Sequence, residues 1–178
     1  MMKRLAWFDR TFPSGLPARL MPLILERLRG TPARVTHRLT AVPPAVLVAK
    51  SGHAWSIQEN VGHLLDMEPL WQRRFGDLAQ QRSELAVADL TNRRTHEANH
   101  NAANLSELLA GFRLARSETL GWLEGVSEAV AAFAAVHPRL NMPMNTVDLA
   151  YFVAEHDDYH LARISELLWE ESLRFEAE

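Results

Sequence analysis

The run Asp148-Leu-Ala-Tyr-Phe-Val-Ala-Glu-His-Asp-Asp-Tyr-His-Leu-Ala-Arg-Ile-Ser-Glu-Leu-Leu168 contains two histidines spaced four residues apart. Its apolar residues recur at the spacing of one helix face, so the run predicts an amphipathic helix. Residues four apart on a helix lie on the same face. That face consists of Leu149, Val153, His156, His160, Ile164 and Leu167. Two imidazoles therefore interrupt a stripe that otherwise has the composition of a core.

A second predicted helix carries a third histidine. It begins in the segment Ser56-Ile-Gln-Glu-Asn-Val-Gly-His63-Leu-Leu65. Ser56 followed three residues later by Glu59 is the pattern of a capping box, in which two side chains accept hydrogen bonds from free backbone amides. Pro69 falls inside this helix and is predicted to kink it near the carbonyl of Leu65. Three imidazoles from two helices could hold one transition metal and leave coordination positions open for chemistry.

A further helix is predicted before these two. Apolar residues at helical spacing follow Pro17, and Gly30 is expected to end or weaken the helix. Thr31 followed by Pro32 has the pattern of a helix cap with proline at the first helical position. We therefore expect a short second helix that ends near Leu39.

The second half of the chain predicts one more long helix before the histidine pair. Asn104-Leu-Ser-Glu107 is a capping signal, and an apolar face at helical spacing follows it. Residues 77–103 are polar and predict a connection with one or two irregular helical turns. The last helix is expected to use Thr146 as its N-cap and to end near Trp169. Only residues 45–49 have a strand pattern, so the fold class is all-α, a four-helix bundle.

Composition limits the class of protein. The 178 residues are 47% hydrophobic and 23% charged, which favours one globular domain over 1–178 with a core of about 17–172. A net charge of −3 gives no basic field, so nucleic acid is not an expected partner. No run approaches the roughly 20 apolar residues of a membrane span, and the first ten residues hold too few for a signal peptide. We expect a cytoplasmic protein with no membrane partner.

The absence of cysteine narrows the chemistry. Disulfides, thiolate metal sites and a cysteine nucleophile are excluded. Any metal must be held by histidine, aspartate or glutamate, and any thiol must come from outside. Ligating histidines usually donate their other ring hydrogen to a carboxylate or a carbonyl. The acidic residues that flank the histidine pair could supply this partner; they are Glu155, Asp157 and Asp158.

Other histidines offer a rival site. His96-Glu97-Ala-Asn-His100 matches the His-Glu-x-x-His pattern of zinc peptidases. That chemistry needs a helix packed into a core, and no large apolar residue surrounds this segment. We expect a polar, exposed segment, with a peptidase as the rival hypothesis.

The three histidines without a partner at ligand spacing are expected on the surface or in loops; they are His37, His53 and His137. The tryptophans are expected as core or interface anchors rather than as a ligand cage; they are Trp7, Trp55, Trp71, Trp122 and Trp169.

Two segments resemble the signatures of the DinB/YfiT-like superfamily of metal-dependent enzymes. They are Trp55-Ser-Ile-Gln-Glu-Asn-Val-Gly-His63-Leu-Leu-Asp66 and Glu155-His-Asp-Asp-Tyr-His-Leu-Ala-Arg-Ile164, and the loop His137-Pro-Arg-Leu140 also fits. The resemblance covers roughly residues 17–172. It implies an up-down-down-up four-helix bundle and a divalent metal. The ligands that it implies are His63, His156 and His160.

The resemblance also sets the functional expectation. Members of the family include thiol-dependent transferases or isomerases and hydrolase-like proteins, and many form dimers. We therefore expect an enzyme with a small-molecule substrate, a homodimer, and zinc or nickel that activates water or a low-molecular-weight thiol. The alternative is a non-catalytic metal-binding helical protein. Glu59, Asn60 or Asp66 could orient water, and the sequence identifies no general base.

Overall fold

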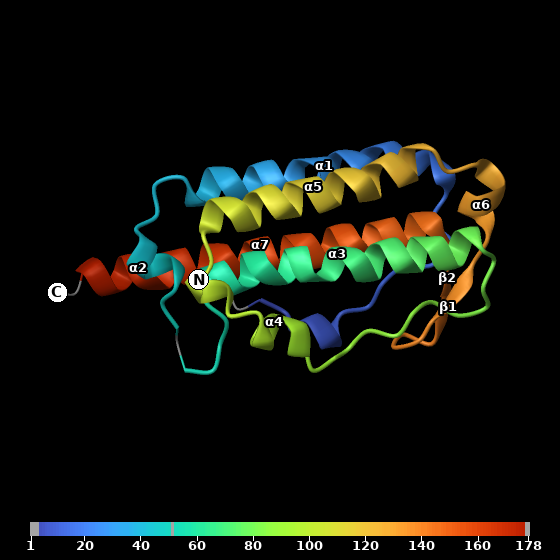
Figure 1. Ribbon diagram of the computed structural model, residues 1–178. Helices are drawn as coiled ribbons and strands as arrows, with labels where there is room; N and C mark the ends of the chain where they lie inside the picture. The colour runs from blue at the N-terminus through green and yellow to red at the C-terminus, as the bar shows by residue number, and fades with distance from the viewer. Residues whose placement is uncertain (1–3, 51, 177–178) are drawn as a thin grey trace.

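Four long helices dominate the computed structural model, which describes residues 4–50 and 52–176 (Figure 1). In Figure 1, two of them run from right to left, α1 (Met21–Leu39) and α7 (Thr146–Glu176). The other two run from left to right, α3 (Ile57–Ala79) and α5 (Leu105–Glu124). Each of α1 and α3 packs against both α5 and α7. The predicted all-α, up-down-down-up four-helix bundle is confirmed.

The shorter elements lie in the segments that lead to the bundle helices or join them. They are η1 (Trp7–Asp9), η2 (Ala18–Leu20), α2 (Pro44–Leu47), α4 (Arg93–Glu97), η3 (His100–Ala102), α6 (Glu128–Ala132), β1 (Ala135–His137) and β2 (Met142–Met144). The strands form an antiparallel hairpin in which Val136 lies opposite Pro143. Residues 45–49, the one run with a strand pattern, do not form a strand, because Pro44 begins a helical turn there. The hairpin was not predicted from the sequence, since each strand has only three residues.

The connection from α3 to α5 must run the length of the bundle, because these two helices are parallel (Figure 1). We call residues 80–104 the crossover. Its first part is attached to β1, where the Leu85 amide donates to the Val136 carbonyl at 3.0 Å. Its second part holds α4 and η3, which confirms the irregular turns expected there. The crossover therefore passes along one side of the bundle beside α3.

The first helix continues where the sequence predicted a break. α1 passes through Gly30 and Pro32 without interruption. A proline inside a helix leaves the carbonyl four residues earlier without its usual donor, and here that carbonyl belongs to Leu28. The buried guanidinium of Arg116 donates from Nη1 to the Leu28 oxygen at 3.3 Å. A contact from another helix thus replaces the bond that Pro32 cannot make.

The predicted helix starts are confirmed for two helices and shifted for a third. Ser56 and Glu59 form the capping box of α3, and Asn104 caps α5. At α7 the cap is Asn145 rather than Thr146. Asn145 Oδ1 accepts from the Asp148 amide at 2.9 Å, and Asp148 Oδ2 accepts from the Asn145 amide at 3.0 Å. α7 also extends beyond Trp169 and ends at residue 176. α3 continues through Pro69.

The core consists of two hydrophobic clusters with charged residues between them. One cluster includes Trp71 and Phe152, and the other includes Leu64 and Ile164. Between them in the sequences of α3 and α7 lie the buried residues Glu68 and Asp157, and both pair with Arg116 of α5. We call Glu68, Arg116 and Asp157, together with the histidines of α3 and α7, the polar layer. It crosses the middle of the bundle.

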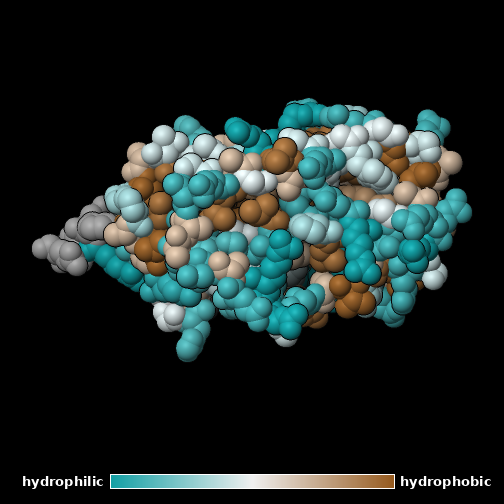
Figure 2. All heavy atoms as spheres, viewed as in Figure 1, coloured by the Kyte–Doolittle hydropathy of each residue, from teal (hydrophilic) through white to brown (hydrophobic). Residues whose placement is uncertain are grey.

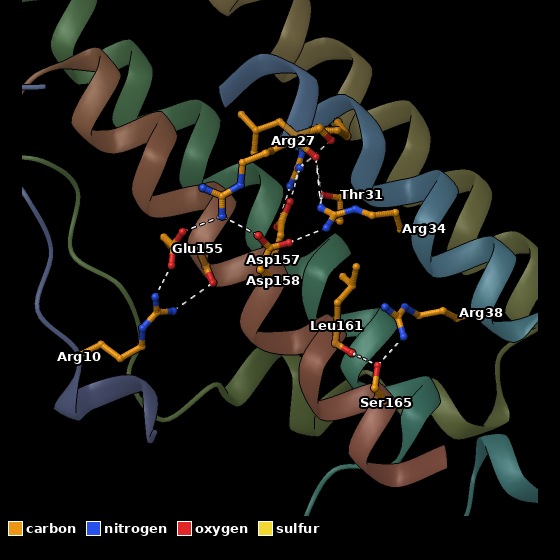
Figure 3. A network of polar contacts seen from close by, with 12 residues as sticks. Arg10, Arg27, Thr31, Arg34, Arg38, Glu155, Asp157, Asp158, Leu161 and Ser165 are labelled. Atoms are coloured by element: carbon orange, nitrogen blue, oxygen red, sulfur yellow. Dashed lines mark hydrogen bonds and ion pairs between the residues drawn. The ribbon is translucent and has the colours of Figure 1, made fainter. Parts of the chain in front are cut away.

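A second set of charges fastens the N-terminal segment and α1 to α7 (Figure 3). Arg27 Nη2 lies 2.6 Å from Glu155 Oε1, and Arg34 Nη1 lies 2.7 Å from Asp158 Oδ1. Arg10 also pairs with Glu155. Farther back along the chain, Asp148 accepts from the backbone amides of Gly15 and Leu16, which lead into α1. These contacts hold the N-terminal segment against α7.

The surface and the helix lengths bear on the expectations of a globular domain and of no membrane partner. In Figure 2, hydrophobic residues on the face seen in Figure 1 form separate groups between hydrophilic ones. Within residues 4–50 and 52–176, none of the helices has the length and hydrophobicity of a membrane span. The expectation about a signal peptide concerns the first ten residues, of which residues 1–3 lie outside the described part of the chain.

Candidate metal centre

The structure brings His63, His156 and His160 together in the polar layer. One ring nitrogen from each lies within 4.8 Å of the others, and all three residues are buried. The ring centroids are 5.3 Å apart for His63 and His156, 4.7 Å for His63 and His160, and 4.6 Å for His156 and His160. The helical spacing explains the second pair, and the packing of α3 on α7 adds His63. Three imidazoles converge on one point.

A hydroxyl and a carboxylate determine which nitrogen of His63 carries the proton. Its Nδ1 lies 3.0 Å from Thr95 Oγ1, and that hydroxyl donates to Asp66 Oδ2 at 3.0 Å. A threonine hydroxyl has one hydrogen, so its oxygen can only accept from His63. Nδ1 is therefore the protonated nitrogen, and Nε2 keeps a free lone pair.

Asn60 determines which nitrogen of His160 carries the proton. The Asn60 amide nitrogen donates to the Ser56 carbonyl at 2.8 Å, so its Oδ1 is the atom that lies 2.9 Å from His160 Nδ1. Because Oδ1 can only accept, Nδ1 of His160 is protonated and Nε2 is free. Nδ1 of His156 is buried and has no hydrogen-bond partner among the described residues. Two oriented imidazoles beside an unpaired third are a donor set that fits a metal ion, because ligating histidines are held through their other ring nitrogen.

The electrostatics keep these imidazoles neutral. Burial lowers the pKa of His63 to about 4. Burial, and after it the neighbouring His63, holds the pKa of His156 well below its ordinary value. Burial and His156 do the same to the pKa of His160. A metal binds the neutral form of imidazole, so the three rings are in the ligating protonation state at neutral pH.

A cavity of about 400 Å³ opens over the histidines. The N-terminal segment covers part of it, because the Trp7 ring lies 5.2 Å from the His156 ring and 5.1 Å from Phe152. Trp55, from the loop before α3, lies 4.6 Å from His63. Trp71 lies 5.4 Å from His156. Trp71 belongs to the core and Trp7 packs against it, as expected of anchors, and these two together with Trp55 also line the cavity.

Three cavity residues were missed by the reasoning from sequence. Arg74 of α3, His137 of β1 and Arg139 of the hairpin turn all line the cavity. His137 was expected on the surface or in a loop, but it lies in β1 and is 1% exposed. Because strand side chains alternate, Ala135 and His137 both face inward and Val136 does not. The unpredicted hairpin explains the error, whereas His37 and His53 are exposed as expected.

The rival peptidase motif is not assembled as a helical metal site. α4 ends at Glu97, and Asn99 has a φ of 50°, so His96 and His100 do not share a helix. The prediction of a wholly exposed segment is also wrong. His100 is buried, its Nε2 lies 2.8 Å from Asp66 Oδ2, and its ring lies against Gly62. The segment packs on α3 because Gly62 has no side chain.

The acidic residues beside the histidine pair have other partners. Glu155 and Asp158 pair with arginines of the N-terminal segment and α1 (Figure 3), and Asp157 pairs with Arg116. The ring partners of the histidines come instead from α3 and the crossover. The three residues that might have oriented water are also engaged. Glu59 serves the cap, Asn60 holds His160, and Asp66 accepts from the crossover.

Comparison with known proteins identifies relatives. The sequence model of the DinB superfamily matches residues 27–164. The structure is similar to YfiT from Bacillus subtilis, described as a probable metal-dependent hydrolase with an unusual four-helix bundle topology. The TM-score is 0.80 at 16% sequence identity, covering 92% of this chain and 94% of that one. A search of curated proteins finds no match. The resemblance predicted from the two signatures is confirmed.

Proposed function

Because the chain belongs to the DinB superfamily, we propose that it is a metal-dependent hydrolase whose metal is held by His63, His156 and His160. The observation that carries this proposal is the convergence of three neutral imidazoles within 4.8 Å in the lining of an open cavity. YfiT, which has the same fold, is described as a probable metal-dependent hydrolase. A structural metal site is usually closed by four protein ligands, whereas a catalytic one keeps a position open. The open cavity therefore favours catalysis over the non-catalytic alternative.

The residues around the histidines have distinct parts in this proposal. Thr95 and Asn60 hold a proton on Nδ1 of His63 and His160, which aims the other ring nitrogen at the shared point. Trp7, Trp55 and Trp71 cover the rings and limit the access of water. Imidazoles that cannot rotate lose little entropy when they bind an ion, so this shell favours metal affinity.

A divalent metal on three imidazoles lowers the pKa of a bound water toward about 7 and polarises a carbonyl or phosphoryl oxygen. Zinc and nickel both suit nitrogen ligands. Among the described residues that line the cavity, the one carboxylate is Asp89, which accepts from Thr91 and from the Arg93 amide in its own turn. The described lining of the cavity thus offers no free carboxylate beside the histidines as a general base. A metal held by His63, His156 and His160 would therefore have to supply the activation of water that a separate base provides elsewhere.

Elemental analysis of the purified protein and its variants tests the proposal. We expect one of zinc or nickel in the wild type, and loss of most of that metal in His63→Ala, His156→Ala and His160→Ala. Hydrolysis of p-nitrophenyl acetate, assayed alongside, is expected to fall with the metal content. His37→Ala is the matched control, because His37 is exposed on α1 and should leave both unchanged. Full metal retention in all three variants would contradict the site, and metal without esterase activity would favour the non-catalytic alternative.

A further inference from the structure

Two arginines, Arg74 and Arg139, line the same cavity as the candidate metal ligands. Arg74 is 2% exposed. Its Nε donates to the Ala86 carbonyl at 2.9 Å, and its Nη1 lies 3.0 Å from His137 Nε2. Nη2 of Arg139 is buried and has no hydrogen-bond partner among the described residues. Arg139, which lines the cavity, therefore has N–H groups without an acceptor among the described residues.

Neither arginine is neutralised by a carboxylate in the described part of the chain. The negative charge that acts on the pKa of Arg74 is that of Asp77, whose carboxylate already accepts from the Ala86 amide and pairs with Arg82. Burial, and then the charge of Arg139, lowers the pKa of Arg74 to about 10. Burial also lowers the pKa of Arg139. Both groups stay charged at neutral pH, and the charge of Arg139 makes the charged form of Arg74 less favourable. Arg74 is a buried cation with a second, half-buried cation beside it, and a bound anion would offset the free-energy cost of this arrangement.

A chain of aromatic contacts leads from the histidines to the arginines. His156 lies 5.4 Å from Trp71, and Trp71 lies 6.0 Å from Phe152, measured between ring centroids. The Cζ atom of Arg139 lies 5.9 Å from the Phe152 ring and 5.2 Å from the Phe8 ring. An apolar aromatic wall thus joins the three histidines to the arginines.

The rim of the cavity is apolar as well. Phe8 from the N-terminal segment is 59% exposed, and Val87 and Leu90 from the crossover are 76% and 55% exposed, although all three line the cavity. Exposed apolar side chains around a concave site are typical of a surface that an apolar ligand covers. The lining therefore combines an apolar wall and rim with a cationic end.

We propose that the substrate is a small organic acid derivative, with a carboxylate held by Arg139 and Arg74 and an apolar body against Trp71 and Phe152. This inference rests on the proposed function, because it places the hydrolysed bond at the histidine end. A guanidinium matches the two oxygens of a carboxylate with paired hydrogen bonds. A single negative charge fits a mostly apolar cavity better than a doubly charged phosphate, since each further charge adds to the cost of desolvation.

Calorimetric titration with benzoate and its neutral isostere benzamide tests the anion site. We expect the wild type to bind benzoate about tenfold more tightly than benzamide, because a charge-assisted hydrogen bond contributes more than a neutral one. Arg139→Gln should weaken benzoate binding by about tenfold or more and change benzamide binding by less than about twofold. Arg139→Lys should restore part of the preference, since it keeps the charge but not the paired geometry.

Arg73→Gln is the matched control, because Arg73 neighbours Arg74 on α3, is exposed and changes the net charge equally. It should leave both affinities unchanged. Equal binding of benzoate and benzamide to the wild type, or equal losses for both in Arg139→Gln, would overturn the proposal. So would benzoate binding that is lost on chelation but survives Arg139→Gln, since that anion would sit on the metal. The titration needs no hydrolysis, so failure of the proposed function in the histidine variants is a separate result.

Discussion

At the scale of single residues, the position of one proton decides whether an imidazole can ligate. Nδ1 of His63 is protonated because the Thr95 hydroxyl donates its only hydrogen to Asp66 and can only accept from His63. Nδ1 of His160 is protonated because the Asn60 amide nitrogen faces the Ser56 carbonyl. In both cases a neutral partner, rather than a carboxylate in direct contact, sets the tautomer. These residues are positioning groups for the proposed metal.

We predict that Thr95→Val weakens metal binding by about tenfold to a hundredfold, because partners of this kind contribute that much to affinity. Valine has nearly the shape of threonine but leaves the His63 N–H without an acceptor. The affinity can be measured by competition with a chromophoric chelator. Thr95→Ser keeps the hydroxyl and should stay close to the wild type, and Thr91→Val, on the exposed part of the crossover, should have no effect. An unchanged affinity in Thr95→Val would refute the positioning role.

At the scale of elements, one stripe of α3 holds the crossover in place. Gln58, Gly62 and Asp66 recur every four residues along that stripe. The Gln58 amide donates to the His100 carbonyl at 2.6 Å, Asp66 lies 2.8 Å from His100 Nε2, and the His100 ring covers Gly62. The same contacts bring Thr95 against His63. The glycine therefore allows the close packing that completes the site.

Gly62→Ala is predicted to destabilise the protein by about 1–3 kcal/mol, the usual cost of overpacking. A Cβ there would lie 2.3 Å from His100 Cδ2. Urea unfolding of the two glycine variants of α3 provides the measurement. Gly76→Ala is the control, because the nearest atom to its new Cβ would be 3.9 Å away. It should stabilise the helix by up to about 1 kcal/mol. If both variants gained stability equally, the packing of His100 on α3 would be in doubt.

At the scale of the whole molecule, Arg116 joins all four bundle helices. It extends from α5, with Nε 2.8 Å from Glu68 Oε1 of α3 and Nη2 3.0 Å from Asp157 Oδ1 of α7. It also donates to the Leu28 carbonyl of α1, which Pro32 leaves free. Burial raises the pKa of Glu68, against the lowering effect of Arg116. The polar layer therefore depends on one guanidinium.

Arg116→Met is expected to lower the free energy of unfolding by about 3–5 kcal/mol, because it leaves two buried carboxylates without their cation. Chemical denaturation followed by circular dichroism would measure this. Arg113→Met removes an exposed arginine from the same helix and should change the stability by less than about 0.5 kcal/mol. Similar stabilities for the two variants would show that the buried network adds nothing to the bundle.

Local signals in the sequence predicted the features that depend on neighbouring residues. The capping box of Ser56 and the cap of Asn104 appear where the pattern placed them, because a helix start needs only residues within one turn. The pair His156 and His160 shares a face for the same reason. Pro32 was misjudged because its compensation comes from Arg116, 84 positions later in the chain. A local rule cannot see such a donor.

By itself, then, the sequence determined the helices, their apolar faces and the two histidine signatures, which together predicted the bundle and three candidate ligands. Only the tertiary structure decided what surrounds them. It turned Glu155 and Asp158 toward α1, brought Thr95 to His63, and placed His137 and Arg139 in the cavity through a three-residue strand. The physical reason is that periodicity records which face of an element is buried. The identity of the groups that meet there depends on contacts between segments far apart in the chain.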